Sequence, residues 1–449
     1  MGILGISAFY HDSAAAILID GELIAAGQEE RFSRIKHDSG FPAHAIKYVL
    51  EEAGMEYNEL TAVIFYEKPL LKFERLLETY HGFAPKGVVS FVSAIPLWIK
   101  EKLFMKKLLQ KQLQQFGTAK IPLLFPEHHL SHAASAFYPS PFEEAAILTI
   151  DGVGEWATLT ISYGSSGGIR VLKELHFPHS LGLLYSAFTY YLGFKVNSGE
   201  YKLMGLAPYG NPNSVQTKFF KEKILTELVD VREDGSILLN MNYFDFATRL
   251  TMTNNRKWEA LFGIPRRKPE SAISQEHMDL ALAIQDVTES IVIALARTAQ
   301  KITHSKNLVL AGGVALNCVA NSKILNAGIF DHIWIQPAAG DAGGAVGAAF
   351  AAFHIRFKKK RTVRLLSDSM NYSYLGPQYS DKDILRAINK YEAGYDYFKN
   401  FDDLSLVVSK KMAEGNVIGW FQDRMEFGPR ALGTEVSSGT PETRRYKKS

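Results

Sequence analysis

Cysteine is almost absent from this sequence: Cys318 is the only one among 449 residues, so no internal disulfide can form. A reducing, cytoplasmic setting is therefore expected. Net charge is also small, with 50 Lys and Arg against 47 Asp and Glu, which gives no support for a nucleic-acid or membrane surface. The longest apolar run, residues 87–99, is too short to cross a bilayer, and the N-terminus lacks the basic segment of a signal peptide. The 47% apolar content still allows a sizeable core and two or more domains.

A pattern of strand, polar loop, strand, tight turn and strand occurs twice. Strands are expected at residues 3–7, 14–19 and 23–26 and, about 145 residues later, at 147–150, 157–161 and 169–172. The loop 151–155, which contains Asp151, Gly152 and Gly154, matches the loop 9–13; either loop alone also fits an ordinary hairpin turn. Because the whole pattern recurs, it indicates a duplicated, two-lobed actin-like ATPase (ribonuclease H-like) α/β fold. In that fold a nucleotide lies between the lobes, and glycine loops let backbone N–H groups approach its phosphates.

Two histidines, His128 and His132, stand four residues apart in a segment that predicts a helix. That spacing places both imidazoles on one helix face, which is two-thirds of a metal site. A third ligand must come from elsewhere, and Asp341 is well placed at the start of a helix made of Gly and Ala. The alternatives are a polar helix start for the histidines and a simple N-cap for the aspartate.

A buried strand at 308–311 runs into Gly312 and Gly313 and then into Val314 and Asn317. A strand-to-glycine-to-helix turn brings backbone against a ligand, and in actin-like folds it meets the adenosine. Asp151 would hold a metal or a water rather than phosphate, because like charges repel. A long amphipathic helix is expected at 277–305, and a variable surface region up to about residue 255.

The expected domains are an actin-like domain at 1–355, with lobes at 1–140 and 145–355, a basic linker at 356–374, and a final part at 375–449. The run 356–364 reads as a solvated boundary. Helices at 381–391 and 402–414 and a strand at 417–421 follow, but this part is too short to build the sheet that would bury them.

Seven segments carry a resemblance to one family: residues 11–16, 29–37, 128–137, 199–210, 312–317, 336–341 and 424–433. Together they resemble the O-carbamoyltransferase family of antibiotic and nodulation-factor biosynthesis. Its members have a large domain similar to the tRNA threonylcarbamoyl transferases and a smaller YrdC-like domain. The resemblance implies that the YrdC-like domain joins carbamoyl phosphate and ATP into carbamoyladenylate, and that the large domain passes the carbamoyl group to a hydroxyl of a small-molecule acceptor.

The resemblance also implies roles for single residues. His128, His132 and Asp341 would ligate a divalent metal of the Fe2+ type, with Mg2+ as the alternative that accompanies ATP. Asp151 and the Gly312-Gly313 turn would contact carbamoyladenylate, and we assign Gly152, Gly154, Val314, Asn317, Arg424 and Arg430 to the same ligand. His11, Asp12 and His37 are the catalytic candidates on the acceptor side, although His11 and His37 also fit structural histidines. The general base stays open, with Asp12 and Asp151 among the candidates.

After Gly433 the sequence departs from its family, reading Thr-Glu-Val-Ser-Ser-Gly-Thr-Pro-Glu-Thr where the family has Asn-Arg-Ser-Ile-Leu-Gly-Asp-Pro-Arg-Asn-Pro. A one-base shift of suitable codons converts one into the other. We therefore expect a frameshift at Gly433–Thr434, an incomplete YrdC-like domain, a tail to Ser449 without a fold, and defective adenylate formation. Resequencing the locus tests this expectation.

Three rival interpretations remain: a sugar kinase of the same fold, a tRNA-modifying carbamoyl transferase, and a catalytically inactive nucleotide-binding remnant. A kinase has no use for the histidine pair, and tRNA-modifying proteins lack the 424–433 segment. The sequence does not name the acceptor, whose recognition we expect in the loops 100–115 and 241–269. A homodimer is compatible with the sequence, and no nucleic-acid or membrane partner is expected.

Overall fold

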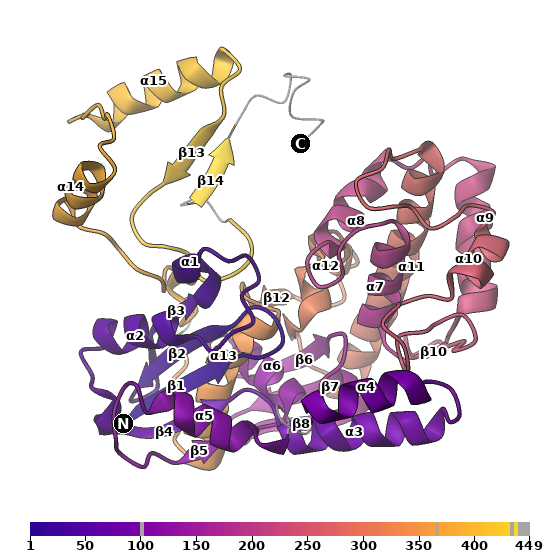
Figure 1. The fold of residues 1–449 in the computed structure, drawn as a ribbon, viewed down its shortest axis with the longest axis horizontal. Helices are drawn as coiled ribbons and strands as arrows, with labels where there is room; N and C mark the ends of the chain where they lie inside the picture. Colours follow the sequence, from indigo (N-terminus) through magenta and orange to yellow (C-terminus); the bar gives the residue numbers. More distant parts are fainter. Residues whose placement is uncertain (99–102, 365–366, 432–434, 439–449) are drawn as a thin grey trace.

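The computed structural model describes residues 1–98, 103–364, 367–431 and 435–438. Two five-stranded sheets form the centres of two lobes (Figure 1). The first has the order β3-β2-β1-β4-β5 and the second the order β12-β11-β6-β7-β8. The strands of the first sheet are β1 (Gly2–Ser7), β2 (Ala14–Ile19), β3 (Glu22–Gln28), β4 (Leu60–Phe65) and β5 (Leu123–Leu124). Those of the second are β6 (Ala145–Ile150), β7 (Ala157–Ser165), β8 (Gly168–His176), β11 (Asn307–Ala311) and β12 (His332–Ile335).

The two sheets have the same topology. In each, three consecutive strands pair antiparallel, and the next two strands add in parallel beyond the first strand of the three. This repeated order is that of the ribonuclease H-like fold, so the duplicated α/β prediction is confirmed. Because β1 and β6 are central in their sheets, both are buried along their whole length, which explains their continuous apolar sequences.

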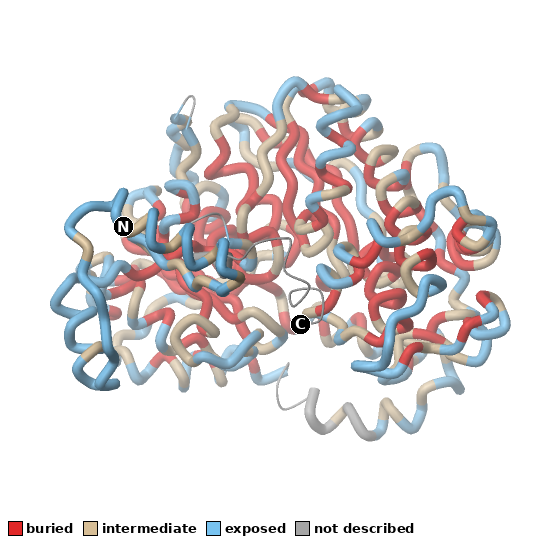
Figure 2. The backbone as a smooth tube through the Cα atoms, turned by 90° about the horizontal axis from the view of Figure 1, so that it is seen from above, coloured by how far each residue is buried: buried red, intermediate tan, exposed pale blue. Residues whose placement is uncertain are grey.

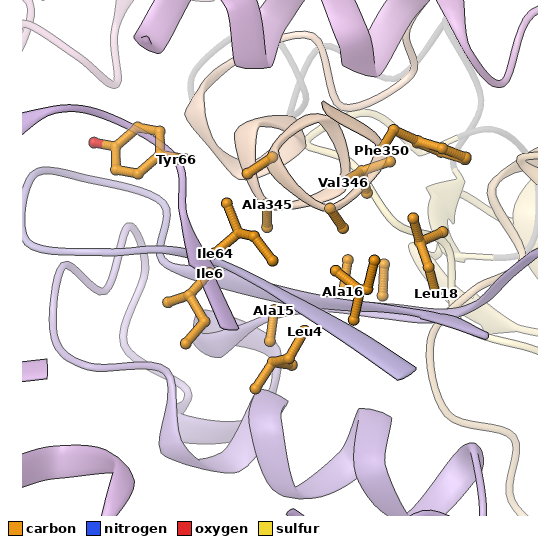
Figure 3. Close-up of a cluster of buried hydrophobic side chains, with 14 of the residues drawn as sticks. Leu4, Ile6, Ala15, Ala16, Leu18, Ile64, Tyr66, Ala345, Val346 and Phe350 are labelled. Carbon is orange, nitrogen blue, oxygen red and sulfur yellow. The ribbon is translucent and has the colours of Figure 1, made fainter. Parts of the chain in front are cut away.

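Two helices lie between the sheets. Helix α13 (Asp341–Ala351) packs on the first sheet, helix α6 (His128–Phe137) packs on the second, and the two helices pack against each other. Figure 3 shows Ala345, Val346 and Phe350 of α13 facing Ala16, Leu18 and Ile64 of the first sheet, whereas Leu4 points to the opposite face. Each helix therefore packs on the sheet of the opposite lobe, an exchange that the expected lobe limits did not anticipate.

The outer faces of the sheets carry other helices. Helix α2 (Ala43–Glu52) covers the first sheet and α11 (Gln275–Thr303) covers the second, with α7 (Leu181–Tyr191) packed against α11. Alternate residues of the second sheet enter two different cores: Ile147 faces the helices between the sheets, whereas Leu148 faces α11 and its neighbours. Figure 2 shows buried residues in the interior of both lobes and exposed residues mainly around their outside.

The second lobe is enlarged by additional elements: α8 (Glu200–Leu206), α9 (Val215–Lys223), β9 (Val229–Val231), β10 (Ile237–Leu239), α10 (Asn255–Phe262) and α12 (Cys318–Asn326). Short 3-10 turns lie at Tyr57–Glu59, Ala207–Tyr209, Gly313–Leu316 and Asn371–Ser373, and π-helical turns at Ile224–Leu228 and Ala352–Arg356. Part of the expected surface region is core: Phe244 is buried and stacks edge-on against Trp258, which is fully buried. The aromatic residues, rather than the polar ones between them, decide where this segment packs.

The first lobe has an insertion between β4 and β5, which consists of α3 (Pro69–Gly82), α4 (Val88–Trp98) and α5 (Met105–Leu113). The short helix α1 (Glu29–Ser33) follows β3 and is not part of this insertion. Figure 1 shows α3 and α4 reaching below the second lobe, where Ser90 Oγ donates to the carbonyl of Thr248 at 2.5 Å. Among the described residues, no helix combines the length and the apolar character needed to cross a membrane. The first predicted acceptor loop, 100–115, lies partly outside the described residues.

The linker is less solvated than expected, because Arg361 donates to the carbonyls of Phe137, Tyr138, Ser140 and Phe142 at the end of α6. Helices α14 (Asp381–Lys390) and α15 (Phe401–Ala413) and the hairpin of β13 (Ile418–Phe421) with β14 (Glu435–Ser438) follow. Strand β14 lies in the tail that was expected to be unstructured, because β13 offers an edge for pairing. The junction Gly433–Thr434 lies outside the described residues, and the expected domain limits stay a prediction.

Candidate metal centre

The two histidines of α6 converge on one point, as their spacing predicts. Both are buried, and their Nε2 atoms are 3.1 Å apart. The start of α6 is held from the second lobe, where both carboxylate oxygens of Glu155 accept the N–H of His128 at 3.0 and 3.1 Å. Two ring nitrogens this close require a shared proton or a cation between them.

Asp341 joins the histidines from the first turn of α13. Its Oδ1 atom lies 3.7 Å from the Nε2 atoms of His128 and His132. The approach depends on glycine, since a Cβ at Gly347 would collide with the carbonyl oxygen of Ser131 on α6. The three residues implied as ligands, remote in sequence, therefore come together.

Asp151, at the end of β6, is a fourth member of this cluster. Its Oδ2 atom lies 2.9 Å from His128 Nε2 and 3.4 Å from His132 Nε2. Its Oδ1 atom accepts the N–H of Gly313 at 3.0 Å, which links the cluster to the second glycine turn. One ligand atom from each of the four residues lies within 4.8 Å of the others.

The cluster fits a divalent metal. Ligands at about 2.1 Å from an ion lie about 3.0 Å apart in octahedral and about 3.4 Å apart in tetrahedral coordination. The contacts of the two histidines within the cluster span 2.9 to 3.7 Å. Two imidazoles with two carboxylates suit Fe2+ or a similar ion better than Mg2+, which prefers oxygen alone. Glu67 Oε2, 3.7 Å from His128 Nδ1, is placed as the outer carboxylate that orients a ligating imidazole.

The histidines and carboxylates of the cluster change one another's pKa values. Burial lowers the pKa of His128, but the hydrogen bond to Asp151, the contact with Glu67 and the charge of Asp341 outweigh it and raise that pKa to about 10. Burial opposes ionisation of Asp151, yet its bonds to both histidines hold its pKa well below the usual range. Without a cation, protons on the imidazoles therefore balance the two carboxylates.

A second group, formed by Asp12, Glu30 and His37, lies beside the first. Asp12 accepts from His37 Nδ1 at 2.7 Å and from His11 Nδ1 at 3.0 Å, so it holds both predicted catalytic histidines. His11 Nε2 lies 3.6 Å from Asp341 Oδ2 and connects the two groups. Burial lowers the pKa of His11, but Asp341 and Asp12 raise it to about 9.

The predicted nucleotide-binding residues divide into two sets. Gly312 has a φ of +90°, and a Cβ there would collide with Ile150, so this turn requires glycine. Arg430 Nη2 donates to the carbonyl of Leu316 at 2.8 Å and thus lies beside the same turn. Gly152 accepts from Ser180 Oγ through its carbonyl, and Gly154 packs beside the His128 ring. Val314 lies within the 3-10 turn that follows Gly312.

The remaining two residues have structural partners. The side chain of Asn317 caps α12 and exchanges hydrogen bonds with Gln285. Arg424 donates to Tyr48 and to Glu52 of α2, at the outer face of the first sheet rather than at the cluster. Their assignment to the nucleotide stays a prediction, which these contacts do not favour.

Sequence reasoning missed several charged residues around the cluster. In the sequence Glu155 stands at the end of the glycine loop 151–155, and no feature of the sequence indicates that it caps α6. Lys72 and Arg75 on α3 are buried, as is Glu67, to which Lys72 Nζ donates at 2.7 Å. A signal did exist, because Lys72 and Arg75 follow Lys68 at helical spacing.

The sheet order and the His–Asp cluster define an actin-like ATPase-fold protein with a candidate metal centre. A family model described as "Carbamoyltransferase N-terminus" matches residues 2–350, and one described as "Carbamoyltransferase C-terminus" matches residues 409–449. The chain belongs to the carbamoyltransferase family.

Relatives agree with this assignment. Protein sll1178 of Synechocystis sp. is 55% identical over 445 residues, covering 98% of this chain and 71% of that protein. Nodulation protein NolNO of Sinorhizobium fredii is 37% identical, covering 96% of this chain, and NolO of Bradyrhizobium diazoefficiens is 34% identical, covering 70%. This chain spans 59% and 53% of the length of these two nodulation proteins. Among solved structures, HypF of T. kodakarensis has a TM-score of 0.38 at 14% identity, covering 81% of this chain and 50% of that one.

Proposed function

We propose that this chain transfers a carbamoyl group from carbamoyladenylate to a hydroxyl of a small-molecule acceptor. The observation that carries the proposal is the convergence of His128, His132, Asp151 and Asp341 on one point between the two sheets. The glycine turn at Gly312–Gly313 is tied to this point through Asp151, which supports a nucleotide at the same place.

In this proposal the four residues hold Fe2+, and the ion supplies Lewis-acid stabilisation for the phosphate of the departing AMP. The backbone N–H groups of the glycine turns approach the same charge and limit its exposure to water. Mg2+ would accompany ATP when the donor is made from ATP and carbamoyl phosphate. We also propose that the acceptor is a small molecule, that the protein is cytoplasmic and that it forms a homodimer.

We further propose His37 as the group that takes the proton from the attacking hydroxyl. Its Nδ1–H donates to Asp12, which leaves the lone pair of Nε2 free to accept a proton. That Nε2 is buried and has no hydrogen-bond partner among the described residues. His11 is less suited to accept a proton, because its Nδ1 contacts Asp12 at 3.0 Å and its Nε2 lies 3.6 Å from Asp341.

The metal is tested directly. The protein would be reconstituted anaerobically with Fe2+, desalted and analysed for metal, together with the variants His132→Ala and Asp341→Asn. We expect about one Fe2+ per chain in the wild type and a loss of affinity of at least tenfold in each variant, as removal of a ligand should cause. His176→Ala is the control, because His176 is an exposed histidine paired only with Glu174. Equal metal content in all four proteins would overturn the proposal.

Carbamoyl transfer is measured with carbamoyladenylate supplied to the reconstituted protein, and AMP release is followed with and without candidate hydroxyl acceptors. In parallel, ATP and carbamoyl phosphate are supplied and pyrophosphate is measured, which tests the expected defect in adenylate formation. Metal binding without any AMP release from carbamoyladenylate would contradict the transferase proposal.

A further inference from the structure

Helix α3 of the insertion is inverted relative to an ordinary amphipathic helix. Its buried face carries Lys72, Arg75 and Thr79, whereas Leu70 is 61% exposed. Long cationic side chains are rarely buried unless they are paired. This face of α3 is therefore built for something other than a hydrophobic core.

Arg75 is the unpaired member of this face. It is only 6% exposed, and its Nε and Nη1 atoms are buried without a hydrogen-bond partner. Across the described residues Arg75 has no ion pair within 4.0 Å, and its guanidinium carbon lies 5.1 Å from the centre of the Phe177 ring in the second lobe. A buried guanidinium whose N–H groups lack acceptors is energetically unfavourable unless an anion or a water molecule accepts hydrogen bonds from them.

Nearby carboxylates are engaged elsewhere. Glu155 accepts the backbone N–H groups of Lys68 and His128. Glu67 Oε2 accepts from Lys72 Nζ at 2.7 Å. Burial lowers the pKa of Arg75 to about 10, although Tyr10, Glu67 and Glu155 oppose the shift, and at neutral pH the guanidinium keeps its charge.

Lys72, on the same buried face of α3 as Arg75, connects that face to the candidate reaction centre on the side of His11. Lys72 Nζ stands 4.9 Å from the centre of the Tyr10 ring, and that ring is 4.6 Å from the ring of His11. Tyr10 is 47% exposed despite these neighbours, so solvent reaches this side. The glycine turn that we assign to the nucleotide contacts the cluster through Asp151 instead.

We propose that Arg75, supported by Lys72, binds an oxyanion carried by the acceptor, a carboxylate or a phosphate group. The planar fork of arginine matches both groups with two parallel hydrogen bonds. The substrate would then be a hydroxyl compound with an anionic group, held so that its hydroxyl faces His37 and the donor. The binding of an oxyanion by Arg75 does not depend on the proposed function. The assignment of this oxyanion to the acceptor does rest on it.

The test is equilibrium dialysis of the Fe2+-loaded protein against 32P-labelled inorganic phosphate, with AMP at saturation to fill the donor site. We expect saturable binding of one phosphate by the wild type, at least tenfold weaker binding by Arg75→Met, and intermediate binding by Arg75→Lys. Lys106→Met is the matched control, because Lys106 is an exposed cation of the same insertion, and it should bind as the wild type does. If Arg75→Met fails to fold by circular dichroism, Arg75→Gln replaces it.

Three results would overturn the inference: no phosphate binding by the wild type, equal binding by the Arg75 variants, or weakening of AMP and phosphate together in Arg75→Met. The last result would assign the oxyanion to the donor. Fe2+ content and AMP release from carbamoyladenylate in water are measured on the same samples. Because neither depends on Arg75, their failure in the wild type would count against the proposed function and not against this site.

Discussion

At the scale of single residues, three positions beside the candidate reaction centre have a strained backbone. Phe9, Asp12 and His37 have φ values of 67°, 53° and 56°, in the left-handed region that side chains other than glycine rarely adopt. Hydrogen bonds hold this geometry, because Glu30 accepts the N–H of His37 at 2.6 Å and Asp12 lies between two imidazoles. The sequence could indicate His128 and His132, since helical spacing is local. It could not indicate these backbone angles, which depend on contacts made after folding.

The role of His37 gives the first prediction. His37→Gln keeps a polar side chain but removes the basic nitrogen, so carbamoyl transfer should fall about 10²- to 10⁴-fold, the usual contribution of general base catalysis. Fe2+ content should stay at the wild-type level, because His37 is outside the four-residue cluster. Carbamoyl-transfer rates of the wild type, His37→Gln and the control His176→Gln, all measured with supplied carbamoyladenylate, test this prediction. An unchanged rate in His37→Gln would remove His37 from the mechanism.

His179 gives a prediction on pH. Its Nδ1 accepts the N–H of Leu239 at 3.0 Å, which requires the neutral ring, and burial lowers its pKa from 6.5. The hydrogen bond to Leu239 therefore stabilises the fold fully above about pH 6.5. This stabilisation is lost as the pH falls, because His179 has the higher pKa in the unfolded chain, which takes up the proton first. His179→Asn keeps an acceptor at this position but cannot titrate. Thermal unfolding from pH 7.5 to 5 should show the wild type losing stability relative to this variant; parallel curves would refute the assignment.

At the scale of elements, close helix packing positions the ligands. The sequence predicted the strands and most helix limits well, because β2 is a continuous apolar run and α11 has apolar residues at helical spacing. The helix made of Gly and Ala after Asp341 was also predicted. The sequence could not predict which sheet each of α6 and α13 would cover, since that depends on long-range pairing. The inverted face of α3 was equally hidden, because exposed leucines and buried cations reverse the usual pattern.

The contact of α6 with α13 is testable at Gly347. A methyl group there would meet the carbonyl of Ser131, so Gly347→Ala should force the helices apart and cost about 1–3 kcal/mol through overpacking. Fe2+ affinity should fall too, because Asp341 moves with α13. Gly205→Ala is the control, since Gly205 is also helical and nothing lies near its added methyl; it should change stability by less than about 1 kcal/mol. Denaturant unfolding and metal analysis of both variants decide the matter, and equal stability would show that the helices can yield.

At the scale of the whole molecule, the C-terminal part is tied to the lobes unevenly. Leu375, Met425 and Phe427 are buried on the first lobe, and Arg430 reaches the second through Leu316. Helices α14 and α15 contain no buried residue. Figure 1 shows both helices standing away from the two sheets. The sequence anticipated a separate part after the linker, but not that its connecting segments dock on the first lobe.

This uneven attachment predicts the order of proteolysis. Helices without buried side chains open easily, so trypsin should cut first at exposed lysines of this region, such as Lys390 and Lys410. Mass spectrometry of a brief digest should therefore show a resistant fragment containing residues 1–351, and that fragment should retain Fe2+. First cuts within the second sheet or α13 would contradict this assignment of stability.

The exchange of α6 and α13 between the halves also governs how the chain can be made. A ribosome delivers the first sheet early, but the helix that covers its inner face ends only at Ala351. Until then the side chains on that face, such as Ala16, Leu18 and Ile64, stay uncovered unless a chaperone binds them. The half that is synthesised first is consequently the half that is completed last.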